Sequence, residues 1–236
     1  MFGILTGVIV NALLVIAGTA AGLIFRTERL KAIGERIFQA FAIFVACMGI
    51  NGAAGMDDPI LVLGCLIVGI AIGEMTDIDD KFNRLGSRLQ RTFSKGSRGD
   101  SRFAEGFVSA SLLFCIGSMT FMGALQSGLE NIHTIYITKG VIDAVSAVTL
   151  AMGSGIGVGF SALAVLLYQG LLTLGASLLS PVLNPDMIAV SSQIGSLFLV
   201  GIALNMLEIK KIKVANFLPA MFMPFIWQAV LLIFQK

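Results

Sequence analysis

The sequence predicts an all-α polytopic membrane protein with about eight transmembrane helices. Its mean hydropathy is +0.92, and only 13% of its 236 residues are charged. A soluble domain carries about 25% charged residues. Several apolar runs reach the length of about 20 residues that crosses a bilayer as a helix, and they do not alternate as barrel strands do. We therefore expect a single transmembrane domain over residues 1–236.

The apolar runs define the eight expected spans. They lie at about 3–25, 37–55, 60–75, 103–126, 138–153, 157–179, 187–207 and 216–235. The first run lacks a basic start and is expected to remain as a helix rather than to be cleaved. The stretch GSGIGVG at 153–159 is rich in glycine, which favours a tight turn or a broken helix between the fifth and sixth spans.

Basic residues predict the orientation of the spans. Most Lys and Arg residues fall in three connections, at 26–36, 81–102 and 210–213. Such clusters mark the cytoplasmic side of a membrane protein. Eight spans place all three connections on that side, with both termini outside.

The connection at 77–102 contains an amphipathic segment. Ile78, Phe82, Leu85, Leu89 and Phe93 recur at helical spacing, and the basic residues lie largely off this stripe. Such a helix is suited to the inner membrane surface. The basic face is short and adjoins two spans, so no nucleic-acid partner is expected.

Two pairs of segments suggest an internal repeat. QAFAIFVACMGIN (39–51) parallels QIGSLFLVGIALN (193–205), and NALLVIAGTA (11–20) parallels QGLLTLGASL (169–178). The predicted topology makes this an inverted repeat of spans 1–3 and 6–8 around two central helices, an arrangement common in transporters. Chance likeness between apolar segments is the alternative.

Polar residues within the spans are the candidates for a substrate pathway, because burying them in lipid is costly. The candidates are Asn51, Ser118, Thr120, Gln126, Lys139, Asp143, Gln169 and Asn205. Hydrogen bonding between helices is the alternative role for the amides. FCIGSMTFMGALQSGL (114–129) carries small or polar residues around much of its helix, which suits either close packing or an unwound segment that lines a cavity.

Lys139 and Asp143 are charged residues in one apolar helix, four positions apart. This spacing puts them on one helix face, where they can neutralise each other as a local clamp. The predicted orientation places Lys139 at the outer end of the fifth span, where its side chain can snorkel to water. Asp143 lies one turn deeper and is either half of the clamp or part of a site.

The sequence contains no arrangement typical of an enzyme. It has no Ser/His/Asp order, no phosphate-binding loop and no metal-ligand spacing, so we expect no catalytic residue, no metal and no cofactor. Cys47, Cys65 and Cys115 all lie in apolar runs and are expected to be packing residues.

Three long stretches carry a family resemblance. They are SASLLFCIGSMTFMGALQSGLENI (109–132), TKGVIDAVSAVTLAMGSGIGVGFSALAVLLYQG (138–170) and ALNMLEIKKIKVANFLPA (203–220). The chain resembles the YqgA-like bacterial membrane proteins, catalogued as domain of unknown function 554, over nearly its whole length. The matching motif positions are Cys115, Gly117, Met119, Gly123, Gln126, Gly128, Leu129, Lys139, Asp143, Tyr168, Gln169, Gly170, Leu204, Asn205 and Leu207. Gly140 and Ala144 stand where the family usually has Ser and Gly.

The resemblance implies a multi-pass protein of the bacterial cytoplasmic (inner) membrane and names no substrate. We expect a secondary transporter or channel-like carrier of a small polar solute or ion. The alternative is a non-transporting scaffold or regulatory protein that docks a partner through the basic segment at 77–102. An intramembrane enzyme is a third hypothesis, with Lys139 and Asp143 as its only candidate pair. Helices rich in glycine also permit a homo-oligomer.

Overall fold

The computed structural model describes residues 3–24, 31–93 and 101–234, and its regular elements in these ranges are all helical. Seven helices are long and apolar enough to span a membrane, and a bent pair makes up an eighth candidate span. The chain is therefore an all-α membrane protein, as predicted. Five basic residues that bear on the predicted orientation lie outside the described residues: Arg26, Arg29, Lys95, Arg98 and Lys236.

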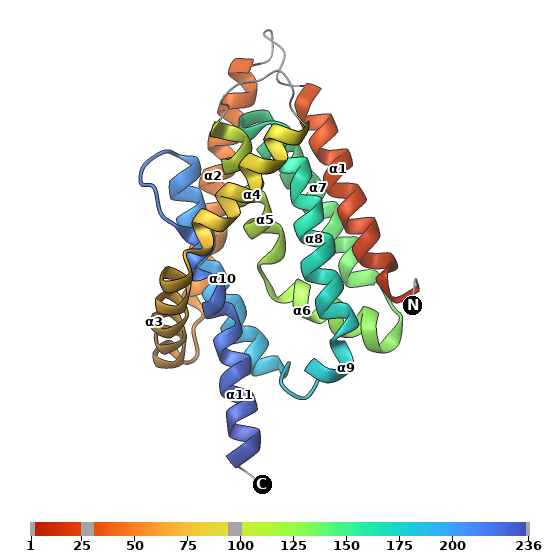
Figure 1. Cartoon of the computed structure of the whole chain (residues 1–236), viewed down its shortest axis with the longest axis vertical. Helices are drawn as coiled ribbons and strands as arrows, with labels where there is room; N and C mark the ends of the chain where they lie inside the picture. The colour runs from red at the N-terminus through yellow and green to blue at the C-terminus, as the bar shows by residue number, and fades with distance from the viewer. Residues whose placement is uncertain (1–2, 25–30, 94–100, 235–236) are drawn as a thin grey trace.

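The helices form two groups with a broken helix between them (Figure 1). One group contains α1 (Thr6–Ile24), α7 (Thr134–Ser154) and α8 (Gly157–Leu174), with the short η1 (Gly3–Leu5) before α1 and α9 (Ala176–Leu179) after α8. The other contains α2 (Lys31–Ala54), α3 (Pro59–Thr76), α10 (Pro185–Met206), the 3-10 helix η3 (Val214–Phe222) and α11 (Met223–Phe234). The broken helix consists of α5 (Ser101–Cys115), α6 (Ser118–Leu125) and a π-helical turn η2 (Gln126–Glu130).

Small residues set the close packing within each group. A Cβ atom on Gly18 of α1 would collide with the Ala144 carbonyl of α7, and one on Gly73 of α3 would collide with the Asn216 carbonyl of η3. These glycines let the backbones of neighbouring helices touch, as in other membrane bundles. The glycine-rich stretch predicted as a turn or break is a turn, with Gly155 at φ 78° between α7 and α8.

Two spans begin at matching caps. The Asp58 side chain accepts a hydrogen bond from the Leu61 N–H at the start of α3, and Pro59 is the first helical residue. The Asn184 side chain accepts from the Met187 N–H at the start of α10, followed likewise by a proline. Each pair satisfies an otherwise unpaired N–H and fixes where the helix starts.

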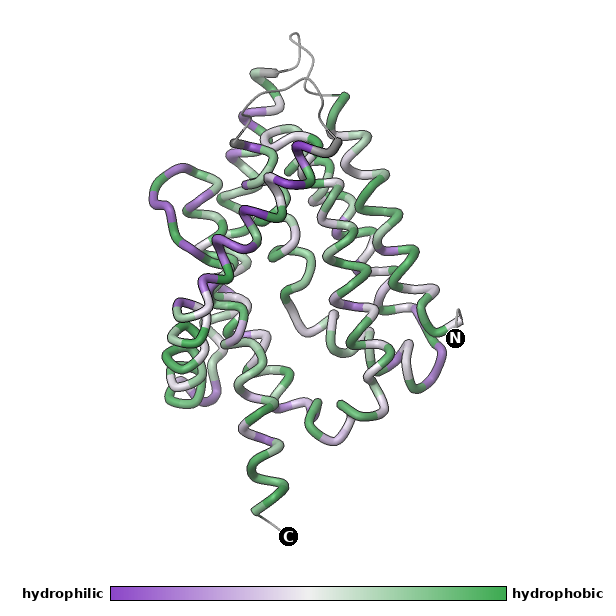
Figure 2. Tube along the Cα trace, viewed as in Figure 1, coloured by the Kyte–Doolittle hydropathy of each residue, from purple (hydrophilic) through white to green (hydrophobic). Residues whose placement is uncertain are grey.

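Polar and apolar residues are separated along the bundle (Figure 2). Hydrophilic residues gather along α4 (Ile78–Phe93) and at the end of the bundle where α4 lies, while the long helices are mainly hydrophobic. Large apolar side chains are exposed on several of these helices, for example Ile60, Val145 and Leu171. Apolar side chains exposed in this way suit the bilayer interior, so the protein contacts the lipid.

The predicted amphipathic helix is present as α4, but its apolar side mainly packs against the bundle. Ile78, Phe82 and Leu89 lie against the core, and the Phe82 ring stacks on Phe107 of α5 with centroids 6.3 Å apart. Leu85 remains exposed. The helix is thus held as a strap over α5 rather than resting on lipid by its whole apolar stripe.

Asn216 ties this strap to the bundle. It is fully buried; its Oδ1 accepts a hydrogen bond of 2.7 Å from the Asp79 N–H, and its Nδ2 donates to Glu74 Oε1 at 2.9 Å. An exposed ion pair joins Lys213 Nζ to Asp77 Oδ1 at 3.2 Å beside it. The side chain of Asn216 therefore connects η3 to both α3 and the start of α4.

The predicted inverted repeat stays a prediction. Helices that it would relate do pack together, namely α1 on α8, α2 on α10 and α3 on η3. Packing between paired helices does not by itself establish a repeat, since α1 also packs extensively on α7.

Candidate functional site

The centre of the candidate site is a buried ion pair on α7. Lys139 Nζ lies 2.5 Å from Asp143 Oδ2, and the two side chains are only 6% and 7% exposed. The expectation that Lys139 snorkels to water is therefore wrong. The helix begins at Thr134, earlier than expected, and Lys139 instead faces the packed interior with Asp143. Charges buried in this way need a partner, which each residue supplies to the other.

Two buried amides surround the pair. Asn11 of α1 and Gln169 of α8 are both fully buried, and Asn11 Nδ2 donates to Gln169 Oε1 at 3.1 Å. The Asn11 amide also lies beside the Asp143 carboxylate. Gln169 Nε2 points to the Phe114 carbonyl of α5 at 3.5 Å. These contacts bring α1, α7 and α8 together at the end of α5.

Tyr136 attaches α6 to the same cluster. Its buried hydroxyl donates to the Thr120 carbonyl at 3.1 Å and lies 3.3 Å from the hydroxyl of Thr173 of α8, which shares its one hydrogen between Tyr136 and the Gln169 carbonyl. The Thr120 hydroxyl is itself buried and has no hydrogen-bond partner in the described structure. Tyr136 lies three and seven positions before Lys139 and Asp143, so the three share one helix face.

The break between α5 and α6 lies next to the ion pair. The two segments are bent by 59°, and Cys115, the last residue of α5, is within electrostatic range of both Lys139 and Asp143. Gly117 takes φ 113° at the bend, a conformation that residues with a side chain rarely adopt. A Cβ atom added to Gly117 would meet nothing within 4 Å, so the bend borders open space.

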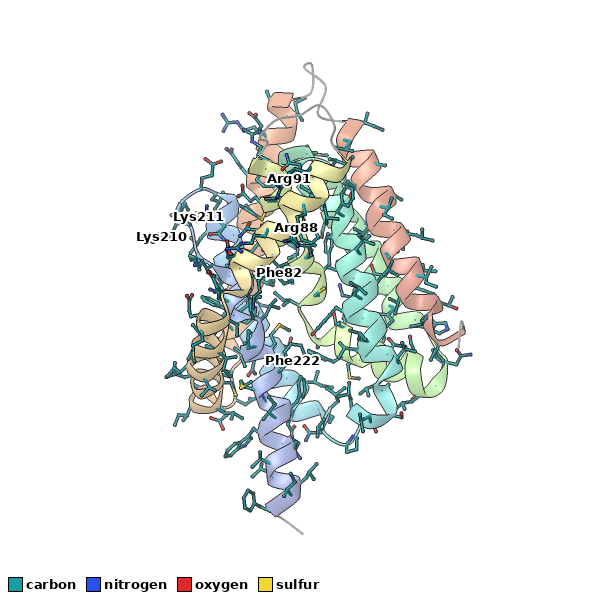
Figure 3. The ribbon with its side chains drawn as sticks, viewed as in Figure 1. Phe82, Arg88, Arg91, Lys210, Lys211 and Phe222 are labelled. Carbon is teal, nitrogen blue, oxygen red and sulfur yellow. The ribbon has the colours of Figure 1, made fainter. Side chains whose placement is uncertain are left out.

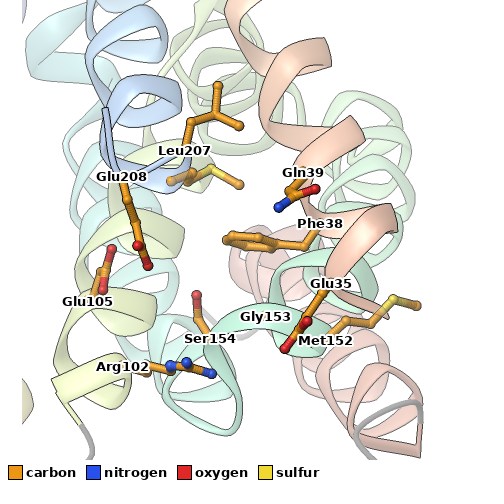
Figure 4. Close-up of a pocket in the computed structure, with 11 residues that line it drawn as sticks. Glu35, Phe38, Gln39, Arg102, Glu105, Met152, Gly153, Ser154, Leu207 and Glu208 are labelled. Carbon is orange, nitrogen blue, oxygen red and sulfur yellow. The ribbon is translucent and has the colours of Figure 1, made fainter. Parts of the chain in front are cut away.

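A cavity of about 610 Å³ lies at the end of the bundle near α4, and we call it the basic-end cavity. Its polar lining consists of Glu35, Gln39, Arg102, Glu105, Ser154 and Glu208. Figure 4 shows the Glu105 and Glu208 carboxylates turned toward each other on one side and Glu35 on the other. Three carboxylates and one guanidinium give this cavity an acidic interior.

A second, largely open depression of about 400 Å³ lies beside the break, and we call it the break cavity. It is lined by Ser118 and Met122 of α6 and by Pro185, Ile188, Ala189, Ser192 and Gln193 of α10. The basic-end cavity is lined by α2, α5, α7 and the end of α10 and so lies between the two groups, whereas the break cavity lies between α6 and the start of α10. They approach the broken helix from opposite ends of the bundle.

The structure brings four of the predicted pathway residues into one cluster: Thr120, Lys139, Asp143 and Gln169. Ser118 lines the break cavity, next to this cluster in the chain. The role of these residues in a pathway stays a prediction.

Three other predicted residues lie elsewhere. Asn205 bonds the backbone of Ile212 through both amide atoms, at 2.7 and 2.8 Å, and so closes the loop after α10. Gln126 Oε1 accepts from the Ile135 N–H at 3.3 Å and holds the turn before α7. Asn51 is exposed near the end of α2. These positions favour structural contacts for Asn205 and Gln126.

Asn11, Tyr136 and Thr173 belong to the cluster but were not among the predicted pathway residues. Asn11 is a polar residue within an apolar run, which marks it as a candidate. For Tyr136, the signal is its helical spacing from Lys139. Thr173 carries no such signal, because an isolated threonine in an apolar helix commonly bonds its own backbone, as Thr173 does to the Gln169 carbonyl at 2.7 Å.

Comparison with known proteins agrees with this architecture. The family model described as "Protein of unknown function (DUF554)" matches residues 6–229. The chain belongs to this family. It is 31% identical over 222 residues to the "Uncharacterized membrane protein YdfK" of Bacillus subtilis (strain 168), covering 92% of this chain and 93% of that protein. It is 28% identical over 220 residues to the "Uncharacterized protein YqgA" of Escherichia coli (strain K12), covering 91% and 92%. No solved structure matches the chain.

The range of residues matched by the DUF554 family model includes both cavities and the ion pair. The matched range contains every element from α1 to most of α11, so the cluster at the break belongs to the part of the chain shared with these relatives. Among the described residues, no group of three His, Cys, Asp or Glu side chains is placed to hold a metal ion.

Proposed function

We propose that this DUF554 protein is a carrier of a small polar solute or ion across the bacterial cytoplasmic membrane, rather than an enzyme. The observation that supports it most strongly is the buried Lys139–Asp143 pair beside a broken span. Ionisable residues inside a membrane usually mark a transport or proton pathway, and broken helices commonly form the substrate sites of carriers. The basic-end cavity at the start of α5 and the break cavity beside α6 would serve as the access routes.

The ion pair has a role in this proposal beyond packing. Lys139 attracts an anionic group of the solute, and Asp143 either holds the solute or carries a coupling proton. Asn11 and Gln169 keep the pair oriented through the hydrogen bond of 3.1 Å between them. An anionic group that pairs with Lys139 displaces Asp143, and the Asp143 carboxylate then takes up a proton, because a buried carboxylate without a partner is costly.

The orientation in the membrane is also part of the proposal. We assign both termini to the outside and the basic end to the cytoplasm, because Lys and Arg concentrate on the cytoplasmic side of membrane proteins. Arg88 and Arg91 of α4 and Lys210 and Lys211 after α10 supply basic residues in the same region of the bundle (Figure 3). The basic-end cavity then opens to the cytoplasm.

Uptake into proteoliposomes tests the carrier function. The purified chain is reconstituted, and flux of a panel of ions, amino acids, organic acids and sugars is measured with and without proton or sodium gradients. Asp143→Asn is expected to abolish the flux, while Asp186→Asn, which changes an exposed carboxylate at the start of α10, leaves it unchanged. Absence of any flux in the wild type, or normal flux in Asp143→Asn, would overturn the proposal.

A scaffold or regulatory function is the second candidate. The position of α4 favours this function. The apolar side of α4 packs against α5, so its basic side faces outward, where the side chain of Arg84 is 73% exposed. Stoichiometric capture of a partner that depends on this basic face, combined with no flux, would support it. Crosslinking in native membranes also tests the homo-oligomer that the sequence permits, with a cross-linked dimer of this chain as the positive result.

A further inference from the structure

The outward side of α4 carries a row of exposed basic residues. They recur at intervals of three and four positions, which places them along one face of the helix. We call this row the basic stripe, and it consists of Lys81, Arg84, Arg88 and Arg91. Leu85 lies beside the stripe and is 47% exposed. Phe82 and Leu89, on the opposite side of the helix, pack against the bundle.

The loop after α10 brings further basic residues to the start of α4. Lys213 pairs with Asp77, the residue just before α4, and Lys211 lies within electrostatic range of Asp79 in its first turn. Lys210 is exposed next to Lys211 (Figure 3). Two segments that are far apart in the chain therefore form one surface. We call the basic stripe together with Lys210, Lys211 and Lys213 the basic surface.

The length of α3 places the start of α4 at the level of the lipid headgroups. With 18 residues, α3 is about 27 Å long, close to the thickness of about 30 Å of the hydrocarbon core of a bilayer. Its last residue, Thr76, then lies at the boundary of that core, and α4 begins at Ile78, after Asp77 alone. Met75, near this end of α3, is 87% exposed, which suits contact with lipid.

The packing of η3 holds the loop at the same level. The backbone of η3 touches α3 near its end, since a Cβ atom on Gly73 would collide with the Asn216 carbonyl. Lys213 directly precedes η3, so it lies level with the end of α3, as its ion pair with Asp77 also requires. Ile209 of the same loop is 66% exposed. Both parts of the basic surface therefore lie where the headgroups of a bilayer would be.

The carboxylates nearby leave the positive charge of this surface available. Arg84 and Lys213 each pair with a carboxylate at or just before the start of α4, at 2.6 and 3.2 Å. Both pairs are exposed to water, which weakens them, so a phosphate group can compete for these cations. Glu105 and Glu208 line the basic-end cavity instead, where their carboxylates turn toward each other (Figure 4).

We propose that the basic surface binds the phosphate groups of anionic phospholipids in the leaflet at the basic end of the bundle. A helix binds such a leaflet through cations that contact the headgroups and apolar side chains that enter the lipid. Leu85 and Ile209 are the apolar side chains that enter the lipid here. In the proposed orientation this is the cytoplasmic leaflet. The binding does not depend on whether the chain carries a solute.

Fluorescence quenching by brominated lipids tests this binding in the full chain. Trp227 is the only tryptophan of the sequence, so Leu85→Trp in a Trp227→Phe background gives one probe beside the basic stripe. The protein is reconstituted in mixtures of phosphatidylcholine and phosphatidylglycerol, with one or the other lipid brominated on its acyl chains close to the headgroup. The two quenching curves give the preference for the anionic lipid at the probe. We expect a preference of about 5-fold or more, which corresponds to the attraction of about 1 kcal/mol between one basic residue and an anionic membrane surface.

Two controls locate the binding. In the wild type, Trp227 is 49% exposed on α11, which runs to the end of the bundle away from α4 (Figure 1), and it should show no preference between the lipids. In the protein with Leu85→Trp, Arg88→Gln should lower the preference by about 5-fold. Arg36→Gln removes one exposed cation from α2, which lies across the basic-end cavity from α5, and it should leave the preference unchanged.

A second probe keeps the test decisive if Leu85→Trp does not fold. Ile209→Trp in the same background reports on the loop, and size-exclusion chromatography checks that each variant is folded. Absence of quenching at both probes, or equal quenching by the two lipids, would overturn the proposal. Equal quenching is also the result expected if this surface binds a protein partner instead. An equal preference at Trp227, or an equal loss in Arg36→Gln, would show that anionic lipid gathers without the basic surface, which would overturn the proposal as well.

Discussion

Removing one charge of the Lys139–Asp143 pair should destabilise the bundle far more than removing both. The pair is 2.5 Å apart and its side chains are 6% and 7% exposed, so the charge left by a single change has little water to compensate it. A single removal from a buried pair costs about 3–5 kcal/mol, whereas replacing both charges is close to neutral. Lys139→Met and Asp143→Asn should each lower the free energy of unfolding by that amount, and the double variant by about 1 kcal/mol or less.

Unfolding of the four proteins in mixed micelles gives the coupling energy through a double-mutant cycle. We expect a coupling of about 5 kcal/mol or more, the sum of the two single losses less that of the double variant, which is larger than for exposed pairs. Flux measured on the same proteins separates a clamp from a site. The folded double variant should remain inactive, because it lacks the groups that handle the solute. If each single variant unfolds like the wild type, the pair is not buried as described; if the double variant transports normally, the pair is only a clamp.

Three further predictions concern the corner where α3, α4 and η3 meet. Gly73→Val should destabilise the fold by about 1–3 kcal/mol or prevent folding, because its side chain would collide with the Asn216 carbonyl; thermal unfolding in detergent measures this. Asn216→Ala should cost about 2–4 kcal/mol through two lost hydrogen bonds, and hydrogen exchange should rise at the Asp79 amide. Lys213 lowers the pKa of Asp77 from 3.8, and Asp77 raises the pKa of Lys213 above 10.5. Lys213→Met should therefore be slightly less stable than the wild type at neutral pH. This difference should vanish as pH falls through the lowered pKa of Asp77, and also as pH rises through the raised pKa of Lys213.

The sequence predicted the spans well because their signals are local. The lengths of the apolar runs predicted eight spans. The glycine-rich stretch at 153–159 predicted a turn or break, which is the turn at Gly155, and the small and polar residues at 114–129 allowed for the break at Gly117. The spacing of Lys139 and Asp143 also predicted their pairing. The prediction that Lys139 reaches water at the end of its span was wrong. An apolar run does not reveal which face of a helix a neighbouring helix will cover.

The contacts around the pair could not be predicted, because they join distant parts of the chain. Asn11 and Gln169 are 158 positions apart, and the Asn216 bond to Asp79 spans 137. Gln193 illustrates the same limit. Its position in a span marks it as polar, but only the fold shows that one amide atom is bonded to Gly55 and that the other has no partner.

Labelling of single cysteines tests the central claim, that two cavities approach the broken helix from opposite sides of the membrane. Ser118→Cys places a thiol in the break cavity and Ser154→Cys places one in the basic-end cavity. The wild type is the background control, because its own cysteines lie in apolar helices. With a membrane-impermeant maleimide, the first thiol should react only from outside the cell and the second only from the cytoplasm. Reaction of both thiols from the same side would contradict the account.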